Sequence, residues 1–398
     1  MRRHLLALLA VLGALVAQDA RTQDVWAQDA GAQEPVRVGL ILPLTGPFTS
    51  TGRQIEAGAR LYMREHGDTV AGRKIELIVK DDGNVADATK RIAQELVINE
   101  KVSVLAGFGL TPLALATAPI ATEAKVPQVV MGAATSIITE RSPFIVRTSM
   151  VTTQITVGIA EWAPRNGVKR VVTLVSDYAP GIDIEKAFIS RFKASGGEVI
   201  SELRVPLANP DFAPFLQRVR DAKPDALFVF VPAGVGAIFM KQFVERGLDK
   251  SGIRLIGTGD MTDDDILNGI GDVALGLTTS HHYSAAHPSE TNRKFVAAFK
   301  AANNGLRPNF MGVGGYDGMA LIYKALAATK GNTDGQALVD AMRGMKWESP
   351  RGPISIDPDT RDIVQNIYVR RVEKVDGELY NVEFATYEAV KDPLKVRN

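Results

Sequence analysis

The sequence lacks cysteine, has few aromatic residues and carries no excess of charge of either sign. Its 398 residues contain no Cys, which excludes disulfides, thiolate nucleophiles, Cys-ligated metal centres and lipid attachment through cysteine. The 46 Lys and Arg residues against 45 Asp and Glu residues argue against a nucleic acid partner, because binding a phosphate backbone requires a basic surface. With 7% aromatic and 45% hydrophobic residues, the composition is that of a globular α/β chain long enough for two domains.

Long hydrophobic runs are also missing, except at the amino terminus. Basic residues at positions 2 to 4 precede an uncharged apolar run from Leu5 to Ala17, and small residues follow it. This layout is typical of a secretory signal peptide, and the run is shorter than the about 20 residues that a membrane-spanning helix needs. We therefore expect a signal peptide over residues 1–27, cleaved somewhere between 17 and 32, and a protein free in the bacterial periplasm without a lipid anchor.

Short apolar runs typical of buried strands recur through the chain. In the first half they cover 36–42, 75–79, 102–106, 128–131 and 144–146, and in the second half 171–175, 198–205, 226–231, 255–257 and 275–279. Helical periodicity appears between them, for example where Ile55, Ala59 and Tyr62 share one face. Strands alternating with helices predict βαβ units, hence two successive α/β halves, each with a mainly parallel sheet flanked by helices.

The last part of the chain shows a different pattern. Helices are expected at 289–303, 315–329 and 334–342, and Asp376-Gly377 predicts a hairpin turn between strands at 363–372 and 379–384. Because no new run of parallel strands appears there, these elements should complete the two halves, with chain crossings near Met150, Tyr283 and Ile356. The expected division is a first lobe of residues 36–150 plus 284–356 and a second lobe of residues 151–283 plus 357–391.

Motifs for catalysis and cofactor binding are missing. The sequence has no G-x-x-x-x-G-K-[ST], H-E-x-x-H or G-x-S-x-G, and the glycine-rich segment 312–318 fails G-x-G-x-x-G at its last position. We expect neither enzymatic activity nor a cofactor. Adjacent His281 and His282 would point to opposite faces of a strand, so no metal site is expected. Thr262 is expected to cap a helix whose positive end favours the aspartates at 263–265.

Small and hydroxylic residues occupy six loops that follow predicted strands. These loops are 46–52, 107–111 and 132–136 in the first half, and 177–181, 232–234 and 257–261 in the second. Ligands of open α/β sheets bind at the carboxyl ends of the strands, and small side chains let an anion approach the N–H groups of a helix start. The sequence therefore predicts a carboxylate pocket in the first lobe, with Tyr178 available to pack on the ligand from the second.

The order of these segments resembles the solute-binding proteins of branched-chain amino acid ABC importers. The resemblance rests on Val38 to Pro47 after the signal peptide, then Gly52, Gly58-Ala59, Asp81-Asp82, Ala133-Ala134-Thr135, Tyr178, Gly181 and Gly315-Tyr316-Asp317. It covers nearly the whole chain after the signal peptide. It implies a two-lobed periplasmic binding protein fold with a three-stranded hinge, closure on a ligand, delivery to an ABC permease in the inner membrane, and a monomer.

The resemblance also implies a set of ligand contacts. The ligand carboxylate would meet Thr111 and the backbone around Ala133, Ala134 and Thr135. Thr51 and Phe108 would flank the cleft from the first lobe, and Tyr178, Ala233, Gly259 and Asp260 would close over the ligand from the second. Tyr283 would help Phe108 and Tyr178 to line an apolar pocket.

Two departures from the family pattern leave the ligand open. Leu110-Thr111 stands where the family often has a Ser/Thr pair, and Gly259 stands where amino acid binders place an acid, with Asp260 beside it. A buried ammonium without a partner costs on the order of several kcal/mol. The ligand is therefore either a branched-chain amino acid whose ammonium pairs with Asp260, or an aromatic or keto acid without an amine. The alternative function is a periplasmic ligand-sensing subunit with the same fold.

Overall fold

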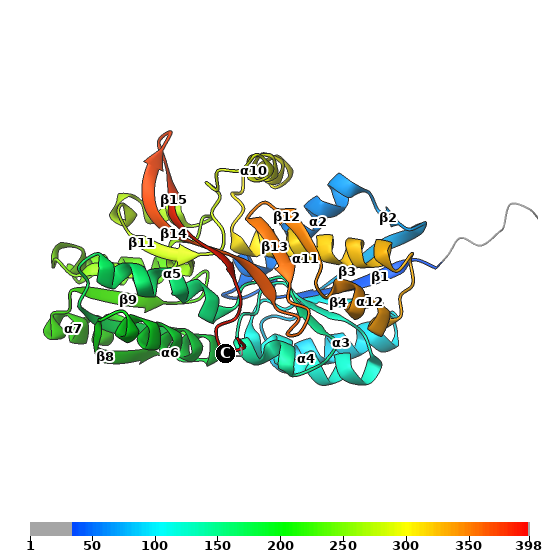
Figure 1. The fold of residues 1–398 in the computed structure, drawn as a ribbon, viewed down its shortest axis with the longest axis horizontal. Helices are drawn as coiled ribbons and strands as arrows, with labels where there is room; N and C mark the ends of the chain where they lie inside the picture. The colour runs from blue at the N-terminus through cyan, green and yellow to red at the C-terminus, as the bar shows by residue number, and fades with distance from the viewer. Residues whose placement is uncertain (1–33, 397–398) are drawn as a thin grey trace, which may run out of the picture.

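The computed structural model describes residues 34–396, and the expected signal peptide lies outside this range. Figure 1 shows two α/β bodies side by side, one for each sheet. The strands of the first sheet are all parallel except for β2, which pairs with β3 in the antiparallel direction. They are β2 (Thr69–Val70), β3 (Arg73–Asp81), β1 (Val36–Leu42), β4 (Val104–Gly107), β5 (Gln128–Val130) and β6 (Ile145–Arg147), in this spatial order.

The second sheet has a parallel part and an antiparallel part. The parallel strands are β8 (Glu198–Val205), β7 (Arg170–Ser176), β9 (Ala226–Phe230), β10 (Arg254–Thr258) and β11 (Thr278–His281). The antiparallel strands are β14 (Ile363–Val375), β13 (Gly352–Ile356), β12 (Lys346–Ser349) and β15 (Glu378–Val390), the last paired with β14. Both bodies therefore contain the mainly parallel sheet that the alternation of strands and helices predicts.

Helices connect the strands within each body. The first body contains α2 (Thr49–His66), α3 (Ala86–Ile98) and α4 (Thr111–Ala124). The second contains α5 (Thr152–Arg165), α6 (Ala179–Ala194), α7 (Ala213–Ala222), α8 (Gly236–Glu245) and α9 (Leu267–Ile270). Five short apolar strands and their helices in each half bury a core of Val, Leu, Ile and Phe side chains on both faces of each sheet.

After β11 the chain returns to the first body. Helices α10 (Glu290–Ala302), α11 (Phe310–Ala328) and α12 (Gly335–Met342) follow, and α11 packs along α2. This packing requires glycine, because a Cβ at Gly58 would lie 1.9 Å from the carbonyl oxygen of Gly312. The three C-terminal helices thus extend the first α/β body rather than form a third domain.

Several sequence predictions differ from the structure in detail. Helix α11 begins at Phe310, before the predicted start at Gly315, because the side chain of Asn309 accepts hydrogen bonds from the N–H groups of Met311 and Gly312 and caps it. The hairpin turn at Asp376-Gly377 is present, with both residues at positive φ. Strands β12 and β13 were not predicted, and they hydrogen-bond into the second sheet although the sequence grouped them with the first lobe. The lobe boundaries stay a prediction.

Buried ion pairs hold the segments that pass between the bodies. Arg147, at the end of β6, lies 2.6 Å from Asp362, just before β14. Arg351 lies 2.8 Å from Asp317 of α11, and all four side chains are at most 1% exposed. Charges this deeply buried are tolerated only as hydrogen-bonded pairs, so these contacts fix the segment before β14 to β6 and the β12–β13 turn to α11.

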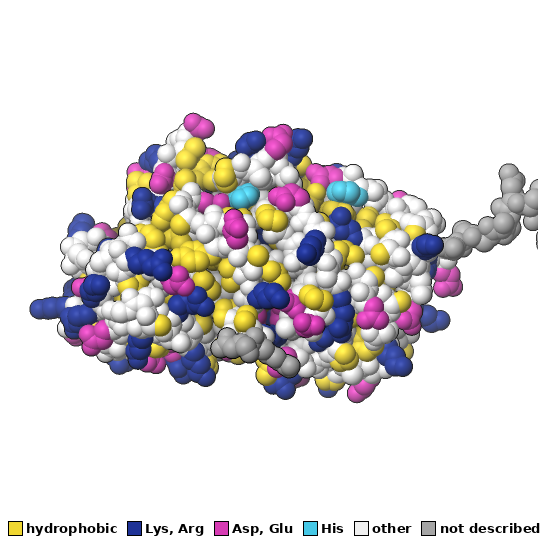
Figure 2. Space-filling view, in the orientation of Figure 1, with side chains coloured by type: hydrophobic (Ala, Val, Ile, Leu, Met, Phe, Trp, Pro, Cys, Tyr) yellow, Lys and Arg dark blue, Asp and Glu magenta, His cyan; other side chains and the backbone are white. Residues whose placement is uncertain are grey.

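The surface shows no concentration of one charge on the face drawn in Figure 2, where basic and acidic side chains are interspersed. Apolar side chains gather over α5, β14 and β15, where Phe384 packs edge-on against Trp162 and beneath the guanidinium of Arg371. Within residues 34–396, no helix is both long and apolar enough to cross a membrane.

Candidate functional site

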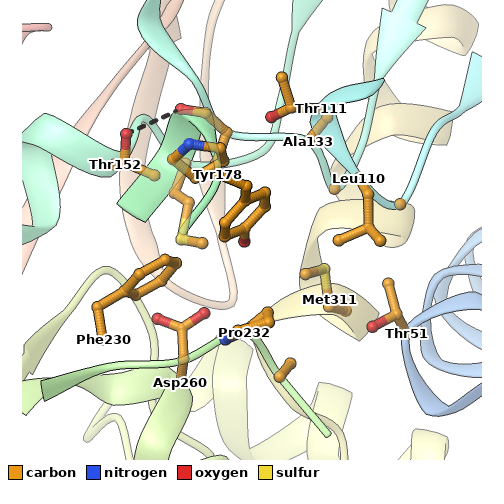
Figure 3. A pocket seen from close by; sticks show the side chains of 16 residues that line it. Thr51, Leu110, Thr111, Ala133, Thr152, Tyr178, Phe230, Pro232, Asp260 and Met311 are labelled. Atoms are coloured by element: carbon orange, nitrogen blue, oxygen red, sulfur yellow. Dashed lines mark hydrogen bonds between the residues drawn. The ribbon is translucent and has the colours of Figure 1, made fainter. Parts of the chain in front are cut away.

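A pocket lies between the two bodies, at the carboxyl ends of strands from both sheets. The space between its walls, counted together with the open solvent at its mouth, is about 360 Å³. Loops after β1, β4 and β5 form one wall, and loops after β7, β9 and β10 form the other (Figure 3). The lining residues are Thr51, Gly109, Leu110, Thr111, Gly132, Ala133, Ala134, Met150, Thr152, Tyr178, Pro180, Phe230, Pro232, Ala233, Asp260 and Met311.

Two helices begin at this pocket, each with a proline in its first turn. Helix α4 starts at Thr111 and α6 starts just after Tyr178, and in the described structure neither has a side-chain cap. Uncapped N–H groups and the positive end of the helix dipole favour a carboxylate. The hydroxyl of Thr111 is held by a 3.2 Å hydrogen bond to Thr135 Oγ1, behind the wall formed by Ala133 and Ala134. The first-body wall can therefore receive an anionic group.

Apolar side chains form the middle of the pocket. The rings of Tyr178 and Phe230 lie nearly parallel, with centroids 6.2 Å apart and an interplanar angle of 10°. Leu110, Met311 and Pro232 complete this region (Figure 3). Burial, and then the negative charge of Asp260, raises the pKa of the Tyr178 hydroxyl, which therefore stays protonated. The middle of the pocket suits a flat apolar group.

Asp260 is the only Asp, Glu, Lys, Arg or His among the residues that line the pocket in the described structure. It is 2% exposed and lies in a short helical turn directly after β10. Its Oδ2 accepts a 2.9 Å hydrogen bond from Thr258 Oγ1 and lies 3.5 Å from His281 Nε2. Burial lowers the pKa of His281 although Asp260 opposes this shift, so the histidine behind Asp260 is neutral at pH 7.

The structure brings together seven of the eleven site residues predicted from the sequence. The seven that line the pocket are Thr51, Thr111, Ala133, Ala134, Tyr178, Ala233 and Asp260. Their contact with a ligand remains a prediction.

The other four predicted residues lie outside the pocket wall. Phe108 is fully buried in the core of the first body, because positive φ angles at Gly107 and Phe108 turn its side chain away. Thr135 is a buried hydrogen-bond partner of Thr111. A Cβ at Gly259 would collide with Arg370, so Gly259 serves close packing, and Tyr283 is buried with its hydroxyl on Asn292.

Nine lining residues were not predicted as site residues. Five of them lie in the predicted loops, and four lie outside these loops: Met150, Thr152, Phe230 and Met311. Phe230 ends a strand that was correctly predicted, so its position beside the 232–234 loop was an available signal. Met311 lies in the first turn of α11, and Asn309 as a helix cap could have indicated it. Met150 and Thr152 lie between the end of β6 and the start of α5, where the sequence predicted a chain crossing but no ligand contact.

The acidic run after Asp260 does not have the predicted capping role. The Thr262 hydroxyl donates to Asn381 Oδ1 at 2.8 Å instead of capping a helix. Asp263 and Asp264 are buried, hydrogen-bonded to Asn309 and Asn381 respectively. The prediction failed because the run packs against β15 and α11 rather than facing solvent. Among residues 34–396, no group of three or more His, Asp or Glu is placed to hold a metal ion.

Comparisons with known proteins identify the class to which this fold and site belong. Residues 35–378 match the periplasmic binding protein family, and the chain belongs to that family. It is of the branched-chain amino acid type, and its role is that of a solute-binding component of an ABC importer, which places it outside the cytoplasm.

Three relatives illustrate the match. The Leu/Ile/Val-binding protein homolog 6 of Brucella melitensis biotype 1 is 46% identical, and the match covers 92% of this chain and 95% of that protein. A solute-binding protein of an ABC transporter from Rhodopseudomonas palustris BisB5, in complex with 3,4-dihydroxybenzoic acid, is 65% identical with a TM-score of 0.90, covering 91% of this chain and 99% of that chain. Another from Rhodopseudomonas palustris HaA2, in complex with p-hydroxybenzoic acid, is 42% identical with a TM-score of 0.88. The match covers 91% of this chain and 99% of that chain.

Proposed function

We propose that this protein captures an aromatic carboxylate without an amine and delivers it to an ABC permease in the inner membrane. The observation that carries the proposal is the layout of the pocket, with an uncapped helix start on one wall and a flat apolar space bounded by Tyr178 and Phe230. A carboxylate on an aromatic ring matches both features. The complexes of the two Rhodopseudomonas palustris relatives with benzoic acids support the same ligand class.

Binding would proceed through closure of the two bodies. Because the pocket is lined from both sides, a ligand that contacts both walls stabilises the closed form over the open one. The site residues we propose are the seven predicted ones that line the pocket, joined by Leu110, Phe230 and Met311. The protein would act as a monomer and would release its ligand unchanged, since binding requires no covalent step.

The test is isothermal titration of the protein without its signal peptide against two panels. One panel contains benzoate, hydroxybenzoates and phenylpyruvate, and the other contains leucine, isoleucine and valine. Binding confined to the first panel supports the proposal. Tight binding of leucine with no response to any aromatic acid contradicts it and assigns Asp260 to an ammonium group. Unchanged ligand recovered after denaturing the complex checks that no turnover occurs.

A further inference from the structure

An acidic run of the second body is covered by two polar side chains of the first body. Asp263 Oδ2 accepts a 2.8 Å hydrogen bond from Nδ2 of Asn309, the residue that caps α11. Asp265 accepts a hydrogen bond from the hydroxyl of Ser50, in the first turn of α2. Both aspartates follow β10, whereas α2 and α11 belong to the first body. Opening of the two bodies would therefore break both contacts.

The cover by the first body leaves the carboxyl group of Asp263 poorly solvated. Asp263 is 3% exposed, and its Oδ1 has no hydrogen-bond partner within residues 34–396. The Oδ1 atom of Asp265 is buried without a partner in the same way. A buried carboxylate oxygen without a donor is costly, and a proton on the carboxyl group removes the charge. The closed form thus favours a protonated Asp263.

Three other carboxyl groups of the same run face Asp263 from the second body. Burial raises the pKa of Asp263, and the charges of three neighbours raise it further: Asp265, Asp264 and Asp260. Because these neighbours follow the same strand, they stay beside Asp263 when the bodies open. Closure adds the cover by Asn309 and removes water that would otherwise solvate the charge.

The positively charged side chains near this run do not pair with Asp263. Arg370, on β14 of the second body, donates hydrogen bonds to β11 and to the loop after it. From the first body, Arg307 and Lys300 lie 2.8 Å and 3.9 Å from Glu378 of β15. None of the ion pairs among residues 34–396 includes Asp263. Closure therefore buries this carboxyl group without bringing a cation to it.

We propose that closure of the two bodies takes up a proton at Asp263, so that this protein binds its ligand more tightly as the pH falls. The proposal rests on the closure described under the proposed function but not on the identity of the ligand. In the open form, water reaches the side of Asp263 that Asn309 covers, and the carboxyl group ionises more readily. Closure disfavours the charged form, so a proton is bound. Acid conditions then favour capture of the ligand, and alkaline conditions favour its release.

The experiment measures the Kd of benzoate by isothermal titration at several pH values, for wild type and for Asp263→Asn. The amide cannot ionise, but it keeps an oxygen for the hydrogen bond from Asn309. The wild-type Kd should therefore rise relative to that of the variant, by at least about 3-fold between about pH 6 and about pH 8, where benzoate stays ionised. His281, His282 and Asp260 are present in both proteins, so their titration cancels from this ratio.

Titration in buffers of different ionisation enthalpy counts the protons bound on closure. Wild type should take up more protons at about pH 7 than Asp263→Asn does. The control is Asp272→Asn, the same change at a side chain that is 68% exposed, and it should behave like wild type. A Kd ratio that does not change with pH, or equal proton uptake by wild type and Asp263→Asn, overturns the proposal.

Two further outcomes remain decisive. If Asp263→Asn does not fold, as judged by circular dichroism, net proton uptake by wild type at about pH 7 supports the proposal and net release overturns it. If leucine binds and benzoate does not, the proposed ligand is wrong, and the same titrations with leucine test the proton uptake. Binding of neither compound overturns the proposed function and this proposal together.

Discussion

Asp263 is a carboxyl group buried among other acids. Burial raises its pKa well above the ordinary value of 3.8, and the charges of Asp265, Asp264 and Asp260 raise it further. The folded protein therefore binds this proton more tightly than the unfolded chain does. Between pH 3.8 and the raised pKa, unfolding releases the proton, so the free energy of unfolding contributed by this group falls as the pH rises.

Asp263→Asn should therefore stabilise the protein at neutral pH. The amide keeps an oxygen for the hydrogen bond from Asn309 and removes the cost of ionisation. We expect the free energy of unfolding at pH 8 to increase by about 1 kcal/mol or more, and the gain to disappear near pH 4. Urea unfolding of both proteins at several pH values measures this. A variant that is less stable than wild type at pH 8 would show that Asp263 is ionised and favourably paired.

The Arg351–Asp317 pair supports a second prediction about single residues. Both side chains are at most 1% exposed, and Asp317 also accepts hydrogen bonds from Ser349 and Trp347. Asp317→Ala leaves a buried guanidinium without its partner and should lower the free energy of unfolding by about 3–5 kcal/mol. The matched control is Asp272→Ala, which breaks the exposed 2.9 Å pair with Lys374 and should cost less than about 1 kcal/mol. Chemical denaturation measures the free energy of unfolding of both variants. Equal losses in the two would contradict the conclusion that burial makes the Arg351–Asp317 pair costly to break.

At the scale of elements, the residues after β15 form hydrogen bonds that connect this strand to the wall of the pocket. Asp392 is 3% exposed and accepts hydrogen bonds from Ser136, next to the Ala133–Thr135 loop, and from Thr153 of α5 at 2.7 Å. Lys395 Nζ lies 2.7 Å from both Thr139 Oγ1 and Asp362 Oδ2. The C-terminal segment thus bridges the loop after β5, the start of α5 and the segment before β14.

Asp392→Ala should lower the free energy of unfolding by about 2–4 kcal/mol, because it leaves two buried hydroxyl groups without their acceptor. Lys391→Ala, at the neighbouring position, is the control. The Lys391 side chain is 56% exposed, and its partner Asp357 keeps hydrogen bonds from the N–H groups of Asp359 and Thr360, so the loss should be less than about 1 kcal/mol. Thermal unfolding of both variants checks the difference. A small effect in Asp392→Ala would mean that water replaces the carboxylate at Ser136 and Thr153.

Regular elements could be predicted from the sequence because their signal is local. The run 36–42 matches β1 at both ends, and the Asp376-Gly377 turn matches the β14–β15 hairpin. Strands β12 and β13 were missed because each is short and Pro350 between them resembles a loop. The pocket loops were located by the rule that ligands lie at strand ends. The direction of each side chain could not be predicted. That of Phe108 depends on a backbone turn, and that of Thr262 depends on Asn381, a partner distant in the sequence.

At the scale of the whole molecule, the first body contributes side chains to the core of the second. Phe48, just before α2, and Leu110, just before α4, belong to the apolar cluster that includes Val235, Phe239 and Met261. Phe48 is 4% exposed, and Ser50 nearby donates a hydrogen bond to Asp265. Opening of the two bodies would expose these groups, so their burial adds to the free energy of closure.

Phe48→Ala should therefore weaken ligand binding without much change in the stability of the unliganded protein. Burying a Phe side chain contributes about 1.5–3 kcal/mol, which corresponds to a loss of affinity of about 10-fold or more. Titration gives the Kd, and small-angle scattering shows whether ligand still reduces the radius of gyration. Val85→Ala, at a position that is 53% exposed, serves as the control and should bind like wild type. If Phe48→Ala lowers the melting temperature of the unliganded protein but keeps the wild-type Kd, then Phe48 is packed in both forms and does not contribute to closure.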